Sequence, residues 1–186
     1  MQAIILAAGE GVRLRPYTIL TPKPLFTVKG IPLITYHVEK LNNLGIKNEK
    51  IICVIKHLKE EIEGYLNKFH KGVKIVEQGK KKGTAAALEY VKNFVKDEEI
   101  LIIYGDIFFE DDLKNFVKEE WALGVAKVED VSKFGKIVSE NGYLREIREK
   151  SESGEGEIFA GIAKVKNDFF NILEKIKPNE KSGEYY

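Results

Sequence analysis

Short apolar runs alternate with amphipathic segments along the first half of the chain, and this alternation constrains the fold more than any other feature. The runs expected to form strands are 2–7, 50–56, 73–76 and 100–104. Between them, apolar residues recur at helical spacing over 33–44, 58–69 and 84–96. Buried strands separated by helices are typical of parallel sheets, because a parallel pair needs a crossover connection. We therefore predict an α/β fold, with a Rossmann-like, mainly parallel sheet flanked by helices.

The pattern changes in the second half of the chain. Asp111 and Asp112 are suited to begin a helix that carries Leu113, Phe116 and Val117, and a strand is expected over 121–127. The runs 136–139 and 143–149 flank Asn141-Gly142, a strong signal for a two-residue hairpin, so an inserted antiparallel hairpin is predicted. A strand over 158–164 and a helix over 168–177 follow. With 186 residues, the chain fits a single domain, 1–186.

A glycine turn with fixed cations follows the first expected strand. Gly9 and Gly11 let the backbone bring bare N–H groups close to an anion, and Arg13, Arg15 and Lys23 add positive charge. The spacing excludes a Walker loop, which needs Gly-Lys-Ser/Thr, and a dinucleotide fingerprint, which needs a third glycine further on. The segment therefore indicates a phosphate-binding loop of another kind.

The other sharp motifs also fall at the carboxyl ends of expected strands. Gln78 follows the short strand 73–76, and Gly105-Asp106 follows the strand 100–104. Folds of this class bind ligands at that edge of the sheet, so we expect these motifs to meet the glycine loop in one crevice.

Composition excludes several classes of partner. The chain has 30 Lys and Arg against 29 Asp and Glu, so no overall field marks a nucleic-acid or membrane binder. The start of the chain lacks the basic region and the long apolar run of a signal or membrane segment, and the expected location is the cytoplasm. The single cysteine, Cys53, lies in an apolar run and is expected in the core. His37, His57 and His70 have no metal-ligand spacing and receive no role.

These motifs resemble those of the sugar-1-phosphate nucleotidylyltransferases. The resemblance begins with LAAGEGVRLRP and PKPL and continues through 77–78, 83–85, 104–106, 135–137, 149–150 and 183–186. It covers essentially the whole chain. The departures are Val12, where the family usually has Thr or Ser, and Phe159, where it usually has Asn.

The resemblance implies transfer of a nucleotidyl group from a nucleoside triphosphate to a sugar 1-phosphate, with release of pyrophosphate. It implies that the catalytic residues are Arg13, which holds the leaving pyrophosphate, and Lys23, which binds the reacting phosphates. The residues that it assigns to the nucleotide are Leu6, Ala7, Ala8, Gly9, Glu10, Gly11, Val12, Gln78, Gly83 and Thr84. The Gln78 amide and the Gly83 backbone would read the base, which favours UTP or dTTP.

The resemblance also implies a metal and an acceptor site. Asp106 is the candidate ligand for Mg²⁺, with Glu110, Asp111 and Asp112 as nearby competitors. The acceptor residues would be Tyr104, Gly105, Gly135, Glu149, Lys150 and Glu184. Lys80-Lys81-Lys82 is either a solvated loop tip, which we favour, or extra charge near the triphosphate.

Two alternatives to this enzyme remain open from the sequence: a cytidylyltransferase for a phosphorylated alcohol, and a non-catalytic regulatory subunit that binds nucleotide sugar. A homo-oligomer is also left open. Family chains normally continue past a segment like 183–186, towards a second metal ligand. We therefore expect this chain to be a catalytic domain truncated at its C-terminal end that turns over poorly, unless Glu110 supplies that ligand.

Overall fold

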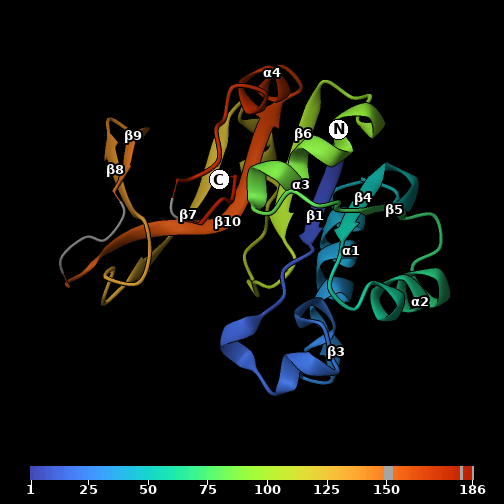
Figure 1. The fold of residues 1–186 in the computed structure, drawn as a ribbon. Helices are drawn as coiled ribbons and strands as arrows, with labels where there is room; N and C mark the ends of the chain where they lie inside the picture. The colour runs from blue at the N-terminus through green and yellow to red at the C-terminus, as the bar shows by residue number, and fades with distance from the viewer. Residues whose placement is uncertain (149–152, 181, 186) are drawn as a thin grey trace.

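Four parallel strands form the central part of the sheet in the computed structural model, which describes residues 1–148, 153–180 and 182–185. They lie in the order β5-β4-β1-β6 (Figure 1). Their bounds are β1 Gln2–Ala7, β4 Ile51–Ile55, β5 Lys74–Glu77 and β6 Glu99–Tyr104. Every residue of β4 is buried, as expected for a parallel strand covered on both faces.

Helices cover both faces of these strands. On one face, α1 (Leu33–Asn43) and α2 (Lys59–Phe69) pack against alternate strand residues such as Ile5 and Cys53. On the other face, α3 (Thr84–Val91) and α4 (Phe169–Leu173) pack against residues such as Ile4. The alternation of side chains along each strand thus divides the core into two layers. The predicted α/β class with a parallel central sheet is confirmed.

Antiparallel strands extend the sheet beyond β6. The long strand β10 (Gly156–Lys166) pairs with β6, and β7 (Ala122–Val128) and β8 (Lys136–Glu140) both pair with β10. The last strand, β9 (Tyr143–Arg148), forms a hairpin with β8. We call β7, β8, β9 and the first half of β10 the arm, because Figure 1 shows them reaching away from the helices.

The predicted hairpin is confirmed. Asn141 and Gly142, with φ of 52° and 80°, join β8 to β9, as a tight turn that follows the strand twist requires. The remaining short elements are β2 Thr27–Val28, β3 Ile31–Pro32, and the 3-10 turns η1 Val12–Leu14, η2 Tyr17–Ile19, η3 Lys23–Leu25, η4 Asn48–Lys50, η5 Lys92–Phe94 and η6 Phe116–Lys118.

The prediction that a helix starts at Asp111 and Asp112 is wrong. The segment forms a turn that ends in η6. The Asp112 carboxylate accepts the N–H of Lys114 at 2.9 Å, and Lys40 donates to the carbonyls of Glu110 and Asp111. These bonds give the backbone partners outside a helix, so an Asx turn replaces the helix start.

The last predicted helix, over 168–177, is also too long. Only Phe169–Leu173 is α-helical. Beyond it, Lys175 and Ile176 bond to carbonyls three residues earlier, as in successive turns. No helix within the described ranges combines the length and apolar character needed to cross a membrane.

The order of the strands fixes the place of a ligand site. The chain runs from β1 outward to β4 and β5, and then returns to the opposite side of β1 to form β6. Such a reversal opens a crevice at the carboxyl ends of β1 and β6.

Candidate nucleotide-binding site

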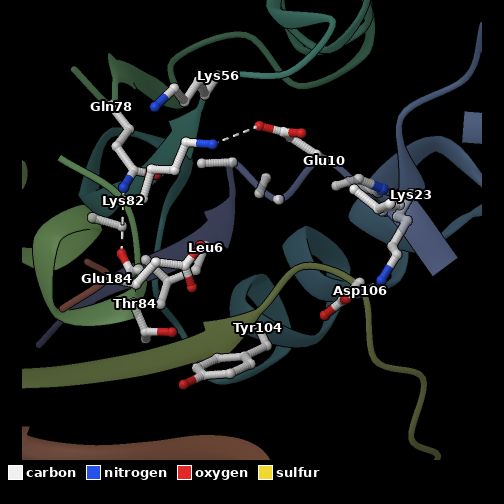
Figure 2. Close-up of a pocket in the computed structure, with 18 residues that line it drawn as sticks. Leu6, Glu10, Lys23, Lys56, Gln78, Lys82, Thr84, Tyr104, Asp106 and Glu184 are labelled. Atoms are coloured by element: carbon white, nitrogen blue, oxygen red, sulfur yellow. Dashed lines mark hydrogen bonds and ion pairs between the residues drawn. The ribbon is translucent and has the colours of Figure 1, made fainter. Parts of the chain in front are cut away.

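A cavity of about 510 Å³ lies at the carboxyl ends of the parallel strands. It is bounded by the segments that follow β1, β5 and β6, so the motifs that the sequence places at strand ends come together (Figure 2). The lining residues are Leu6, Ala7, Ala8, Gly9, Glu10, Gly11, Val12, Lys23, Pro24, Lys56, Gln78, Lys82, Gly83, Thr84, Ala87, Tyr104, Asp106 and Glu184.

Two glycines at this site are required by close approach of the chain. Gly11 has a left-handed φ of 64°, and a Cβ there would lie 2.7 Å from the Thr18 methyl group and 3.0 Å from Cε of Lys23. Gly105 donates its N–H to the Leu6 carbonyl at 2.8 Å, and a Cβ would come within 2.9 Å of that oxygen. Substituents at either position would separate segments that the cavity needs side by side.

Lys23 and Asp106 form an ion pair at one end of the cavity. The Lys23 ammonium lies 2.9 Å from the Asp106 carboxylate, with their side chains 26% and 41% exposed. Figure 2 shows the two side chains directed toward one another from the turn η3 and the end of β6. An exposed ion pair of this kind contributes little to the stability of the fold. A ligand can therefore replace either partner at little cost in free energy.

Gln78 lies at the opposite end and is almost fully buried, with 6% of its surface exposed. Its side-chain nitrogen donates to the carbonyls of Lys81 and Gly83 at 2.9 and 3.3 Å. Because carbonyls only accept, these bonds orient the amide with its oxygen free of the loop. Gln78 therefore holds the loop between Lys81 and Gly83 in place.

The Gly83 loop is held from its other side by the last described residues. Tyr185 donates its N–H to the Lys82 carbonyl at 2.9 Å and accepts the Ala85 N–H at 3.1 Å. A Cβ on Gly83, whose φ is 101°, would lie 2.1 Å from the Tyr185 carbonyl oxygen. This pairing brings Glu184, a predicted acceptor residue, into the lining.

Two lining lysines are not among the sequence-predicted site residues. Lys56 directly follows β4, and its ammonium donates to the Gly79 carbonyl at 2.8 Å. Lys82 lies 3.3 Å from Glu10 across the cavity, whereas Lys81 pairs with Glu89. The Lys82 side chain is 58% exposed and also lines the cavity, so a solvated loop tip and a charge near a bound triphosphate both stay predictions for 80–82. The position of Lys56 at a strand end was the signal that could have identified it.

Some predicted site residues lie elsewhere. Arg13 is exposed on η1 and does not line the cavity, although Val12 next to it does. Gly135 lies in the arm between β7 and β8, also outside the lining. Glu149 and Lys150 fall outside the described residues.

Phe159, at which the sequence departs from the family pattern, lies next to the cavity residue Tyr104. Phe159 of β10 packs edge-on against Tyr104, with ring centroids 5.5 Å apart. Burial raises the pKa of the Tyr104 hydroxyl, which keeps it a neutral hydrogen-bonding group at physiological pH. Phe159, which stands where the family usually has Asn, lies outside the cavity lining, and its side chain has no hydrogen-bonding group.

A second buried group lies near Asp106. His37 of α1 is 1% exposed, and burial lowers its pKa from 6.5 to about 4. Its ring stacks on Phe109 at 6.1 Å, and neither ring nitrogen has a hydrogen-bond partner within the described residues. His37 is thus neutral and belongs to the core behind the Asp106 turn.

The residues present fit a magnesium ion that is shared with a ligand. No cluster of three or more His, Cys, Asp or Glu side chains that could hold a metal occurs in the described ranges. Asp106, however, presents a half-exposed carboxylate to the cavity. Mg²⁺ typically binds one or two carboxylates and completes its shell with phosphates and water, so this single carboxylate suits a cation that arrives with a triphosphate.

The cavity thus brings a glycine loop, cations and a carboxylate together at the ends of parallel strands, an arrangement suited to a phosphorylated ligand. Residues 2–184 match the model of the Nucleotidyl transferase family, and the chain belongs to that family.

Individual relatives agree with this assignment. A protein from Methanocaldococcus jannaschii, described as bifunctional protein GlmU, is 40% identical over 184 residues, which cover 97% of this chain and 44% of that protein. The UTP–glucose-1-phosphate uridylyltransferase AglF of Haloferax volcanii is 33% identical over 197 residues, with coverage of 100% and 79%. A solved structure from Bacillus anthracis, assigned as a glucose-1-phosphate thymidylyltransferase and bound to sucrose, has a TM-score of 0.82 and 30% identity, with coverage of 96% and 76%. The chain thus spans less than half the length of the GlmU relative.

Proposed function

We propose that this protein transfers a nucleotidyl group from UTP or dTTP to a sugar 1-phosphate, forming a nucleotide sugar and releasing pyrophosphate. The observation that carries the proposal is the cavity at the switch point of the sheet. Its lining joins the glycine loop, Lys23 and Asp106 on one side to the Gln78–Gly83 loop on the other.

The reaction needs no protein nucleophile. A phosphate oxygen of the sugar 1-phosphate attacks the α-phosphorus, the bond to the bridging oxygen between the α- and β-phosphorus breaks, and pyrophosphate leaves with that electron pair. Such a step is accelerated by holding the two reactants in line and by neutralising the charge that moves toward the leaving group. The glycine loop supplies backbone N–H groups, and Lys23 supplies a point charge beside Asp106.

Lys23 and Asp106 must exchange partners when a substrate enters. In the structure they satisfy each other at 2.9 Å. An incoming triphosphate competes for the Lys23 ammonium, and this frees the Asp106 carboxylate. When bound there, Mg²⁺ would neutralise phosphate charge during the transfer.

Base recognition is assigned to the Gln78 side chain and the Gly83 backbone. The Gln78 oxygen faces away from the carbonyls that bind its nitrogen, so it can accept the imide N–H of uracil or thymine. The name of the Haloferax volcanii relative, a UTP-using enzyme, supports the same choice.

The acceptor is proposed to be a hexose or N-acetylhexosamine 1-phosphate. Tyr104, Gly105 and Glu184 are the predicted acceptor residues that lie at or next to the cavity. The role of Arg13 in holding pyrophosphate stays part of this proposal, and it requires η1 to bring the exposed guanidinium over the bound triphosphate.

The deciding experiment is a panel of nucleoside triphosphates crossed with hexose 1-phosphates and phosphocholine, read out as Mg²⁺-dependent release of pyrophosphate. We expect release with UTP or dTTP and a sugar 1-phosphate, and its loss in Asp106→Asn. Release only with CTP and phosphocholine would establish the cytidylyltransferase alternative. Binding of nucleotide sugar without any release of pyrophosphate would establish the regulatory alternative.

A further inference from the structure

Thr18 is a buried polar residue in an otherwise exposed, apolar segment. Its exposed fraction is 1%, whereas Tyr17, Ile19 and Leu20 are 74%, 56% and 81% exposed. This is the reverse of the usual pattern, in which apolar side chains are buried and hydroxyls face water. A hydroxyl buried in this way needs a specific partner.

The partner is the glycine loop. The Thr18 hydroxyl donates to the Gly11 carbonyl at 2.9 Å, and the N–H of Leu14 donates to the same oxygen at 2.9 Å. The carbonyl and N–H of a trans peptide point in opposite directions, so fixing the Gly11 carbonyl also fixes the Val12 N–H. That N–H faces away from Thr18. Gly11 and Val12, which share this peptide, line the cavity, whereas Thr18 does not, so the peptide that Thr18 fixes is part of the cavity wall.

His57 anchors Thr18 to the sheet. Its Nε2 lies 2.8 Å from the Thr18 carbonyl oxygen, and since a carbonyl only accepts, Nε2 carries the proton. His57 comes two residues after Ile55, the last residue of the fully buried strand β4. Two hydrogen bonds, joined through the Thr18 residue itself, therefore link His57, just beyond the end of β4, to the Gly11 carbonyl.

The same contact reaches Lys23. The Thr18 methyl group and the Lys23 stem lie on Gly11, at 2.7 and 3.0 Å from where a Cβ would be. A side chain at position 11, or movement of Thr18, would therefore disturb the packing that directs the Lys23 ammonium toward Asp106.

We propose that Thr18 and His57 are positioning residues for the triphosphate, acting through the Gly11 peptide and the Lys23 stem. This inference rests on the proposed function, because it assumes that a triphosphate occupies the glycine loop. Hydrogen-bond donors that are held in place before binding need no reorganisation when the ligand arrives. Without the bonds of Thr18 and His57, the glycine loop would have to be ordered during binding, and this would lower the affinity for the triphosphate.

The test compares Thr18→Val, which removes the hydroxyl at nearly constant shape, with Thr18→Ser, which keeps it. Thr21→Val, an exposed threonine in the same segment, is the matched control. We expect Thr18→Val to weaken binding of inorganic tripolyphosphate, measured by calorimetry, and to lower kcat/KM for UTP, each by about tenfold or more. Thr18→Ser keeps the bond to Gly11 and loses only the methyl contact, so its losses should be clearly smaller than those of Thr18→Val, and Thr21→Val should stay within about threefold of the original protein in both measurements.

His57 provides an independent arm. His57→Leu removes the donor to the Thr18 carbonyl, so it should reproduce the loss, and the double variant with Thr18→Val should lose no more than either single variant, because both interrupt one chain of bonds. Equal tripolyphosphate affinity in Thr18→Val and Thr18→Ser would overturn the inference. So would full additivity of the two losses. If the original protein releases no pyrophosphate, the proposed function fails, but the tripolyphosphate comparison still decides the positioning role.

Discussion

The parallel half of the molecule and the arm differ in how much of each strand is buried. Strand β4 is buried at every residue, whereas β9 is exposed at every residue and β7 alternates between half-buried and exposed positions. The cavity is built almost entirely on the parallel half. In the proposed function the donor nucleotide would therefore meet backbone fixed by the core, while the predicted acceptor residue Gly135 lies in the connection between β7 and β8, next to strands whose geometry costs little to change.

The contrast in burial between the two halves is tested most directly by removing the same apolar atoms from each half and comparing the loss of stability. Ile5 in β1 is 0% exposed and Ile147 in β9 is 45% exposed. We expect Ile5→Ala to lower the free energy of unfolding by about 2–5 kcal/mol. Ile147→Ala should change it by about 0.5 kcal/mol or less. Urea unfolding followed by circular dichroism measures both, and similar losses would show that the arm is as tightly integrated as the core.

The next largest effect concerns chemistry on the parallel half. Lys23→Ala should lower kcat by roughly 10²-fold or more, because its charge acts on phosphates whose charge shifts in the transition state. Lys127→Ala, an exposed lysine in β7 of the arm, is the control and should leave kcat within about twofold. Steady-state kinetics over a range of UTP concentrations, with saturating Mg²⁺ and sugar 1-phosphate, measures kcat and KM of both variants. A raised KM with unchanged kcat in Lys23→Ala would show that the lysine only binds the ground state.

Arg13→Ala belongs to the same series. The resemblance assigns Arg13 to the leaving pyrophosphate, but the structure leaves its side chain exposed outside the cavity lining. A loss in kcat equal to that of Lys23→Ala would show that η1 closes over the triphosphate. No loss would remove Arg13 from the proposed catalytic residues.

The sequence predicts the parallel half of the molecule better than it predicts the arm and the loops. Periodicity identified the parallel strands and their helices, because buried strands and amphipathic helices carry clear patterns. The strand ends then located Gly9, Gln78 and Asp106 at one cavity. For Lys56 and Lys82, by contrast, exposure and pairing depend on which loops face one another across the sheet, which periodicity does not encode.

The prediction of a helix at Asp111 failed for two reasons, one local in the sequence and one distant. Asp residues favour both helix starts and Asx turns, and the sequence cannot choose between these. Lys40, far away in the sequence on α1, binds the carbonyls of Glu110 and Asp111 and favours the turn. The direction in which the arm extends from the sheet could not be predicted from the sequence either, because a hairpin signal identifies a turn but not the orientation of its strands.

A pH experiment sharpens the comparison from the core side. His37, buried in the parallel half, has its pKa lowered from 6.5 to about 4 by burial, with smaller opposing effects of Asp106, which raises it, and Lys40, which lowers it. Between these two pKa values the unfolded chain binds a proton that the folded protein does not. The contribution of neutral His37 to the free energy of unfolding is therefore fully present above about pH 6.5. It falls as the pH drops toward 4, by up to about 1.4 kcal/mol per pH unit.

The matched variant is His37→Phe, which cannot titrate. Carboxylates that are common to both proteins contribute equally, so the difference in slope between pH 6.5 and 4 isolates His37. Urea unfolding at intervals across that window should give a shallower slope for the variant. Parallel slopes would show that His37 is already charged in the folded protein, with a pKa near its unfolded value.

The smallest expected effect is base selection, which should depend on the parallel half alone. We expect UTP or dTTP to exceed ATP and GTP by roughly tenfold to a hundredfold in kcat/KM, since mispairing a buried polar edge costs about 1–3 kcal/mol. Gln78→Ala removes the acceptor and also the bonds to Lys81 and Gly83, so it should reduce that ratio toward one. Leu144→Ala in β9, where the side chain is 45% exposed, should leave the ratio unchanged. Competition assays with mixed triphosphates measure these ratios directly. Equal use of ATP by the original protein would remove Gln78 as the reader of the base, and a ratio altered by Leu144→Ala would show that the arm takes part in recognising the nucleotide.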